Sequence, residues 1–306
     1  MKPQWEGVYP AITTKFNVDE SIDLSLFSKN IRAQIQAGVE ELIVGGSLGE
    51  AALLSLKEKE ILVKQALSDT DGLIPVILNI AENSLKEAIA LIQLAEQWGA
   101  HGLMVLPPMR YKSDERESLH WFSQIAQSTT LPIMIYNNPI DYKIEVTPDM
   151  FEELSAYDNI QAVKESTRDV TNVTRMINRF GNRYKILCGV DTIAMEALTM
   201  GAHGWVAGLV NAFPEETVAL YRLVKEGRTE EALSLHRWFL PLLELDIHPK
   251  LVQYIKRAQA TTGLGSEHVR APRLKLEGDE RKEIIAIIEN AMANKPALPA
   301  FKTVRV

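Results

Sequence analysis

A lysine at the end of an apolar run is the first residue in this sequence that could do covalent chemistry. Residues 159–166 read NIQAVKES, and the strand-like apolar run ends directly at Lys164. Burying an ammonium is costly, so an apolar strand end lowers the pKa of a lysine from its ordinary value of about 10.4. The neutral amine can attack a ketone and form a Schiff base. Taken alone, a lysine paired with an acid is the commoner case, and Glu165 is the nearest acid.

A tyrosine and a glycine-rich turn could supply two further groups. Tyr136 opens the motif YNNP after another apolar run, and its phenol could move protons if hydroxyl groups form a relay with it. Residues 45–50 read GGSLGE, which offers backbone N–H groups and the Ser47 hydroxyl to a carboxylate. Each feature alone is more often structural, as an aromatic cap on the core or a plain turn. Together, an amine, a phenol and a carboxylate cradle suit an enzyme of 2-oxo acids.

A repeating series of strands and helices must position these groups. Helix starts are indicated by Asp23, by the capping boxes SLKE at 55–58 and 84–87, and by Thr147 before Pro148. Short apolar runs alternate with these amphipathic stretches. Strands are expected at 9–14, 42–44, 74–78, 103–106, 133–136, 160–164, 186–189 and 205–207, each followed by a helix.

Eight such units in roughly 220 residues favour an α/β fold of the (β/α)8 TIM-barrel type. An open doubly wound sheet shows the same alternation, but the count of eight favours the barrel. A glycine after a helix and a strand soon after it recur at 37–44, 98–105 and 200–207, which indicates one reused unit. In a barrel, reactive groups gather at the C-terminal ends of the strands, where all three features above would meet.

The barrel is expected over residues 1–228 and a C-terminal helical extension over 229–306. After residue 228 the strand pattern stops, and the extension could be an interface element. The last residues, KTVRV, are expected to be a mobile end. Helices of the extension are predicted at 230–243, 249–262 and 280–293.

Composition excludes several classes of protein. The 306 residues are 46% hydrophobic and carry a net charge of −7 without a long basic run, so no nucleic-acid partner is expected. No apolar run approaches the length of a spanning helix, and the start lacks the apolar core of a signal peptide. Cys188 is the only cysteine, so no internal disulfide can form, and its apolar surroundings suggest a core residue. We expect a cytoplasmic protein that does not bind membranes.

Five ordered motifs resemble the dihydrodipicolinate synthase and N-acetylneuraminate lyase superfamily over nearly the whole chain. They are GSLGE (46–50), YNNP (136–139), VKES (163–166), GVD (189–191) and Gly208 to Asn211. The resemblance implies a barrel, a Schiff-base lysine, a small-molecule substrate and a homotetramer made of two tight dimers. It implies no metal and no organic cofactor, and the six histidines form no pair with acids at ligand spacing.

The likeness also assigns roles to residues. Lys164 would form the iminium, Tyr136 would relay the proton, and Gly46 with Ser47 would hold the substrate carboxylate. Glu50, in the same turn, is expected to have a structural role. The implied catalytic residues are Lys164, Tyr136 and Ser47, and the implied substrate-binding residues are Gly46, Ser47, Leu48, Asp141, Gly189 and Val206.

The sequence departs from the synthase of this family at three places. The synthase has an arginine two residues after the YN-x-P proline, whereas this chain has Asp141, which would repel a second substrate carboxylate. Leu48 replaces the second hydroxyl of the usual GTTGE-type turn. The segment PPMRY stands where the synthase has PYY, so Arg110 or Tyr111 could reach a neighbouring subunit. A proton relay would therefore run from Tyr136 to Ser47 and stop there, or continue to Tyr111.

The stretch YNNPIDYK and the following VTP resemble the bacterial enzymes that deaminate 1-pyrroline-4-hydroxy-2-carboxylate in hydroxyproline degradation. That substrate has a single carboxylate, which suits the cradle at Ser47 and needs no distal arginine. Three alternatives stay open: 4-hydroxy-tetrahydrodipicolinate synthase of lysine biosynthesis, an aldolase or dehydratase of 2-keto-3-deoxy sugar acids, and a ligand-binding barrel without turnover.

Overall fold

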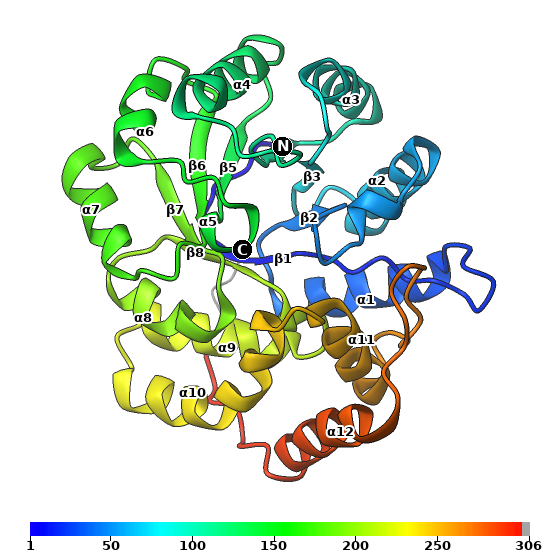
Figure 1. Ribbon diagram of the computed structural model, residues 1–306. Coiled ribbons are helices and arrows are strands. Elements are labelled where there is room, and N and C mark those ends of the chain that lie inside the picture. The colour runs from blue at the N-terminus through cyan, green and yellow to red at the C-terminus, as the bar shows by residue number, and fades with distance from the viewer. Residues whose placement is uncertain (302–306) are drawn as a thin grey trace.

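Eight parallel strands form a barrel in this computed structural model, which describes residues 1–301. The strands are hydrogen-bonded in the order β1-β8-β7-β6-β5-β4-β3-β2, and a parallel bridge between Ala11 and Ile43 joins the two ends of that order. Figure 1 shows the ring of helices around the strands. The predicted (β/α)8 barrel is therefore confirmed, whereas the segment 302–306 that we expected to be mobile lies outside the described residues.

The strands are β1 (Gly7–Pro10), β2 (Leu42–Val44), β3 (Val76–Ile80), β4 (Gly102–Val105), β5 (Ile133–Asn137), β6 (Ile160–Glu165), β7 (Lys185–Cys188) and β8 (Gly204–Ala207). All eight were predicted, but the expected bounds of two differ clearly. The first strand ends at Pro10 because the chain then leaves the sheet and enters a loop. In that loop Thr13 N–H donates to Asn211 Oδ1. The third starts at Val76 because Pro75 has no N–H to contribute to the ladder.

Helix starts follow the capping signals. The Asp23 carboxylate accepts a hydrogen bond from Leu26 N–H at the start of α1 (Leu24–Ala37). Ser55 and Glu58 form the predicted capping box of α2, while Ser84 and Thr147 cap α3 and α6. The barrel helices after α1 are α2 (Leu56–Thr70), α3 (Leu85–Trp98), α4 (Glu115–Gln127), α5 (Pro139–Tyr142), α6 (Pro148–Leu154), α7 (Thr171–Phe180), α8 (Ala194–Thr199) and α9 (Pro214–Lys225).

The repeated glycine signature corresponds to a repeated turn between helix and strand. Gly38 and Gly99 end α1 and α3 in the left-handed region, with φ of 88° and 91°. In two of the repeats a histidine follows, and its Nδ1 accepts a backbone N–H of a neighbouring strand: His101 from Val76 and His203 from Ile186. One local solution is thus used more than once in the barrel.

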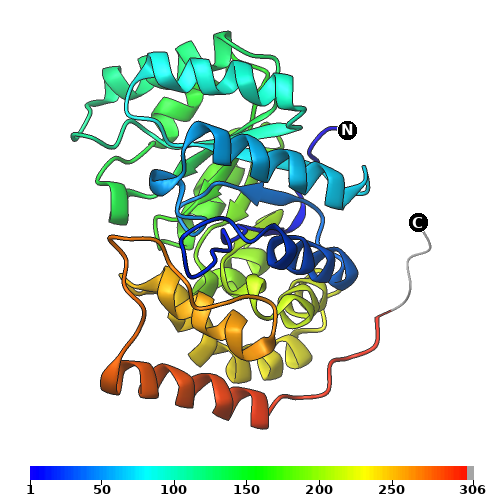
Figure 2. The same cartoon turned by 90° about the vertical axis from the view of Figure 1, so that its right-hand side faces the viewer.

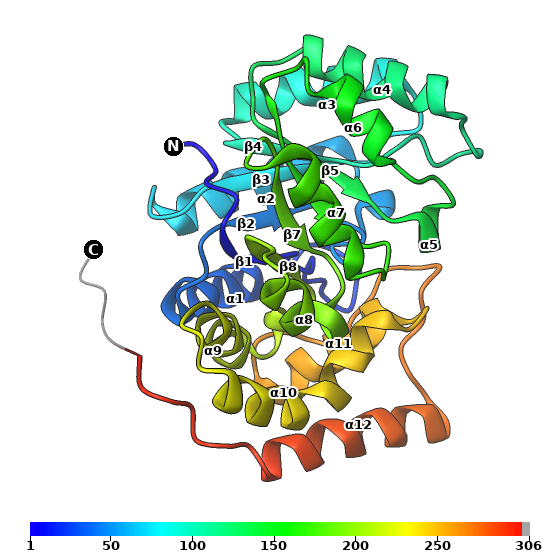
Figure 3. The same cartoon turned by 90° about the vertical axis from the view of Figure 1, so that its left-hand side faces the viewer.

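Three helices follow the barrel helices, as predicted: α10 (Thr229–Leu243), α11 (Leu251–Thr262) and α12 (Gly278–Ala293). Figures 2 and 3 show α12 along the outer side of α10 and α11, away from the strands. The short 3-10 helix η4 (Glu244–Ile247) connects α10 to α11. No helix among residues 1–301 is long and apolar enough to cross a membrane.

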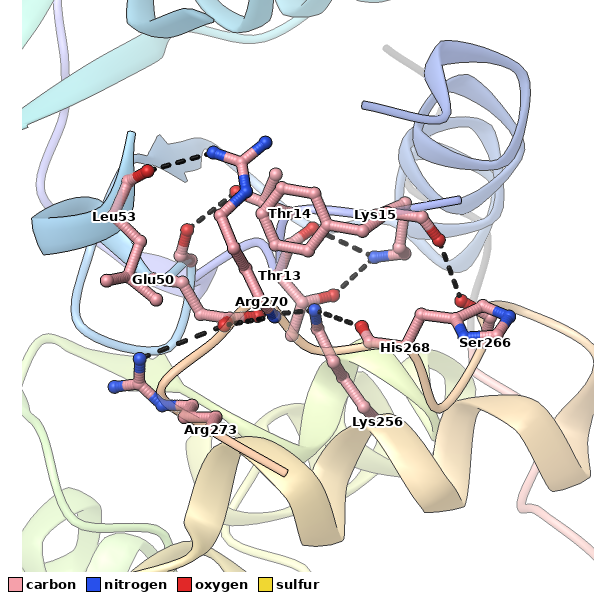
Figure 4. Close-up of polar contacts among 12 residues, drawn as sticks. Thr13, Thr14, Lys15, Glu50, Leu53, Lys256, Ser266, His268, Arg270 and Arg273 are labelled. Atoms are coloured by element: carbon pink, nitrogen blue, oxygen red, sulfur yellow. Dashed lines mark hydrogen bonds and ion pairs between the residues drawn. The ribbon is translucent and has the colours of Figure 1, made fainter. Parts of the chain in front are cut away.

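A buried group of charged side chains attaches the extension to the barrel (Figure 4). Lys256 on α11 pairs with Glu50, which follows β2, at 2.5 Å, and both side chains are fully buried. Lys256 Nζ also donates to the carbonyl oxygen of His268 at 2.7 Å. Arg273 approaches Glu50 at 3.8 Å, and Arg270 N–H donates to the same carboxylate. The partners of Glu50 are therefore groups that hold the extension against the barrel, which agrees with the structural role expected for this residue.

Candidate active site

Two neighbouring strands bring Lys164 and Tyr136 together. In the parallel pairing of β5 with β6, Tyr136 lies opposite Lys164, so both side chains lie on the same face of the sheet. The Lys164 ammonium nitrogen is 4.0 Å from the centre of the Tyr136 ring. Both residues are near the C-terminal ends of their strands, where barrel enzymes hold their reactive groups.

A cavity of about 490 Å³ opens at these strand ends. Its wall includes Lys164, Tyr136 and Ser47, the three residues predicted to be catalytic. All the residues predicted to bind substrate line the same cavity: Gly46, Ser47, Leu48, Asp141, Gly189 and Val206. The structure thus collects in one place residues that are spread over about 160 positions of the sequence.

Burial shapes the chemistry of Lys164. The side chain is only 8% exposed, and this burial lowers its pKa, although Tyr142, Asp246 and Asp191 partly oppose the shift. Glu165, considered as an ion-pair partner, has its carboxylate elsewhere: it accepts from Thr167 N–H and from the Asn172 amide, each at 2.8 Å. Within residues 1–301, Lys164 has no salt bridge, so its amine is available to a ligand in the cavity.

The Tyr136 hydroxyl is held by an amide. Asn138 Nδ2 donates to this hydroxyl at 3.1 Å and to Asp141 Oδ2 at 2.7 Å. Burial raises the pKa of Tyr136 to about 12, so its phenol keeps its proton at neutral pH. Asp141 lies at the rim of the cavity, where the synthase motif would have an arginine.

Ser47 has a different hydroxyl partner from the one expected. Its Oγ lies 2.6 Å from the hydroxyl of Tyr142, not in a hydrogen bond with Tyr136. The Tyr142 ring meets the Tyr136 ring edge to face, with centres 5.6 Å apart. Tyr142 belongs to α5, whose first turn is capped by the Asn138 side chain. Sequence reasoning missed this residue although it stands in the quoted YNNPIDYK, because nothing in the spacing shows that α5 turns back toward the glycine-rich loop.

Gly189 contributes by lacking a side chain. A Cβ on this residue would lie 2.6 Å from Lys164 Cε and 2.2 Å from Ser166 Oγ. No real side chain tolerates such contacts, so glycine leaves the room that the lysine occupies. The Ser166 hydroxyl is buried, borders the cavity and has no hydrogen-bond partner within the described residues.

Two residues proposed for a longer relay lie elsewhere. The Tyr111 side chain is 57% exposed and lines a separate cavity that also includes Trp121. Arg110 is exposed on the same loop and lines neither cavity. A role for either residue therefore needs a neighbouring subunit and stays a prediction.

The extension supplies a cavity residue that sequence reasoning missed. Asp246, in η4, lies on the cavity wall and influences the pKa of Lys164. A Cβ on Gly208 would lie 2.1 Å from Asp246 Oδ1, so this glycine makes room for the carboxylate. No motif surrounds Asp246 in the sequence, and only the packing of the extension places it here.

The described part of the chain has neither a metal-binding cluster nor a reactive thiol. Among residues 1–301, no group of three or more His, Cys, Asp or Glu side chains could hold a metal ion. Cys188 is buried, as expected, and burial raises the pKa of its thiol to about 12. A protonated, enclosed thiol is a poor nucleophile.

A (β/α)8 barrel with a buried lysine beside a tyrosine at its mouth defines a class I lyase, an enzyme that binds carbonyl substrates through a lysine Schiff base. The model of the Dihydrodipicolinate synthetase family matches residues 4–291, and the chain belongs to this family. The predicted family is thereby confirmed. Membership in a family of enzymes also argues against a barrel that binds ligand without turnover.

Relatives and solved structures agree with this assignment. The chain is 28% identical over 292 residues to a 4-hydroxy-tetrahydrodipicolinate synthase of Methanoculleus marisnigri, which covers 94% of this chain and 99% of that protein. Dihydrodipicolinate synthase DapA-2 from Bacillus anthracis has a TM-score of 0.89 at 27% identity, covering 94% and 99%. YagE, a prophage protein of the dihydrodipicolinic acid synthase family from E. coli K12 in complex with pyruvate, has a TM-score of 0.88 at 27% identity, covering 95% and 99%.

Proposed function

We propose that Lys164 forms a Schiff base with a small 2-oxo acid or its cyclic imine, and that the preferred substrate is 1-pyrroline-4-hydroxy-2-carboxylate, which the enzyme deaminates. The observation that carries this proposal is that Gly46, Ser47 and Asp141 line one cavity with Lys164. We assign the substrate carboxylate to Gly46 and Ser47, and the Asp141 carboxylate would repel a second one. Such a site suits a substrate with one carboxylate near C2. A solved structure of similar fold, YagE, was obtained with pyruvate, itself a 2-oxo acid.

We infer the following order of steps for this substrate. The neutral Lys164 amine attacks C2, and the ring nitrogen leaves as an amine on C5. The resulting iminium acidifies C3, which loses a proton, and the hydroxyl on C4 then departs as water. Loss of a proton from C5 and hydrolysis release ammonia, and a second hydrolysis frees Lys164. In total, one water is lost and two are consumed. The product is a 2-oxo acid semialdehyde, with the ketone at C2 and the aldehyde at C5.

A second candidate is 4-hydroxy-tetrahydrodipicolinate synthase, because the relative from Methanoculleus marisnigri has that name. Its semialdehyde substrate brings another carboxylate into the site. Asp141 would repel that group instead of pairing with it, and Asn138 keeps the Asp141 carboxylate at the rim. An aldolase or dehydratase of 2-keto-3-deoxy sugar acids is the third candidate, since the same lysine chemistry would serve it.

A substrate panel separates the three candidates. Purified enzyme is given 1-pyrroline-4-hydroxy-2-carboxylate, pyruvate with aspartate semialdehyde, or 2-keto-3-deoxy sugar acids, and ammonia, condensation product and aldehyde are measured. We expect ammonia release from the cyclic imine to have the highest kcat/KM. Condensation of pyruvate with the semialdehyde at a higher kcat/KM would identify the synthase instead. Asp141→Arg is the matched variant, and we expect it to lower activity on the cyclic imine.

A further inference from the structure

The extension places one carboxylate inside the active-site cavity. Asp246 belongs to η4, between α10 and α11, and lies against Gly208 just after β8. A Cβ at that glycine would lie 2.1 Å from Asp246 Oδ1. The buried pair of Lys256 and Glu50 attaches α11, which directly follows η4, to the barrel (Figure 4). The position of the carboxylate therefore depends on its contact with Gly208 and on the attachment of α11.

Asp246 differs from the other acids around the cavity in having no partner. Asp191 accepts from Trp205 Nε1 at 2.9 Å and from Leu209 N–H at 2.8 Å, and Asp141 accepts from Asn138. No hydrogen bond or ion pair within residues 1–301 involves the Asp246 carboxylate, and only burial and nearby charges shift its pKa. Its oxygens are therefore free for a ligand in the cavity.

The surroundings of Asp246 favour its protonated form. Burial raises its pKa well above the ordinary value, and the charge of Asp191 adds to that shift. Asp141 acts in the same direction, while Lys164 and Arg168 oppose it. A carboxyl group whose pKa is raised holds its proton to higher pH, which suits it to act as a general acid.

Asp246 and Tyr136 reach the cavity from different parts of the barrel. Tyr136 lies on β5, which neighbours β6, whereas Asp246 lies against Gly208 just after β8, the second strand from β6 in the other direction. Gly189, which follows the intervening β7, leaves room for the Lys164 side chain. A substrate held on Lys164 would thus share the cavity with a phenol and a carboxyl group.

We propose that Asp246 donates the proton to the departing C4 oxygen of a substrate bound to Lys164, so that the enzyme takes 2-oxo acids or cyclic imines with a hydroxyl on C4. This proposal rests on the proposed function. After C3 has lost its proton, the enamine electrons form the C3–C4 double bond and the C4–O bond breaks. The oxygen leaves as water with the Asp246 proton, and hydrolysis of the product later returns a proton to the carboxylate. The C3 proton passes to the amine that ring opening frees on C5, because the Tyr136 phenol keeps its own proton at neutral pH.

The test compares Asp246→Asn with Glu244→Gln, an exposed position of the same 3-10 helix outside the cavity. Asparagine has nearly the same shape but no acidic proton. We expect Asp246→Asn to lower kcat for ammonia release from 1-pyrroline-4-hydroxy-2-carboxylate by about 10²–10⁴, the usual contribution of a general acid. Borohydride trapping of pyruvate on Lys164, exchange of the pyruvate methyl hydrogens with deuterium oxide, and the thermal midpoint should not fall below wild-type values, because loss of the carboxylate only lowers the pKa of Lys164 further. Glu244→Gln should change nothing.

Three results would overturn the proposal. If Asp246→Asn keeps kcat close to that of wild type, Asp246 is not the acid. If it loses trapping and hydrogen exchange together with turnover, it only supports the position of Lys164. A wild-type enzyme that traps pyruvate but releases no ammonia from the cyclic imine would refute the proposed function first, and the role of Asp246 would fall with it because no C4 hydroxyl would leave.

Discussion

The reactivity of Lys164 depends on side chains that are distant in the sequence. The carboxylate of its neighbour Glu165 accepts hydrogen bonds from Thr167 and Asn172, so an ion pair between Lys164 and Glu165 does not form. The amine instead lies over the Tyr136 ring, in the space that Gly189 leaves free. A glycine is thus as necessary for the nucleophile as any polar group of the cavity.

Gly189→Ala tests this requirement. The added methyl group would stand 2.6 Å from Lys164 Cε and 2.2 Å from Ser166 Oγ, so the lysine side chain has to move. We expect the rate of borohydride trapping with pyruvate to fall by at least about 10²-fold, because a misplacement of about 1 Å costs that much. The thermal midpoint should fall only slightly. An unchanged trapping rate would show that the Lys164 side chain does not need the space at Gly189.

Elements whose boundaries depend on local chemistry were predictable from the sequence. Asp23 and Ser55 cap the helices that they were expected to cap, because a cap needs only a side-chain oxygen and the next turn of backbone. The expected bounds of β1 and β3 were shifted, because the length of a ladder depends on the partner strand and on where Pro75 interrupts it. Local signals therefore predicted helices better than strand ends.

The attachment of α11 gives a prediction at the scale of elements. Lys256 and Glu50 are both fully buried, so Lys256→Met leaves a buried carboxylate with no ion pair closer than Arg273, at 3.8 Å, and a hydrogen bond from Arg270 N–H. We expect a loss of about 3–5 kcal/mol in the free energy of unfolding, measured with urea. Lys250→Met is the matched control, because Lys250 pairs with Glu280 at the surface and should cost at most about 1 kcal/mol.

A double variant checks the reason for the expected loss. When Glu50→Gln is added to Lys256→Met, the buried charge that lacks a partner is removed, and part of the stability should return. Glu50→Gln is also measured alone. If the loss in the free energy of unfolding of the double variant equals the sum of the losses of the two single variants, the two residues are not coupled, and the loss comes from packing alone.

At the scale of the whole molecule, the barrel was predictable but parts of the site were not. Eight repeated units predicted the fold, and strand ends predicted the place of Lys164 and Tyr136. Tyr142 and Asp246 were not found, because their closeness to Ser47 and Lys164 arises from the turn of α5 and the packing of the extension. Expectations based on strand positions cannot include residues brought in by later segments.

The assembly state is a prediction that belongs to the same scale. We expect a homotetramer, and the exposed Tyr111 beside a cavity with Trp121 is a surface that a second copy could cover. Sedimentation velocity should give about four times the mass of one chain at micromolar concentration. A protein that sediments as a monomer and is fully active would remove any role of Tyr111 in a neighbouring active site.

The most direct test of the central claim is the identity of the residue that binds substrate. Wild-type enzyme and Lys164→Ala are incubated with pyruvate and borohydride, digested, and analysed by mass spectrometry. We predict that one reduced pyruvate adduct appears on Lys164 in the wild type and that the variant shows none. An adduct on another lysine such as Lys256, or a wild-type protein left unmodified at saturating pyruvate, would contradict the mechanism.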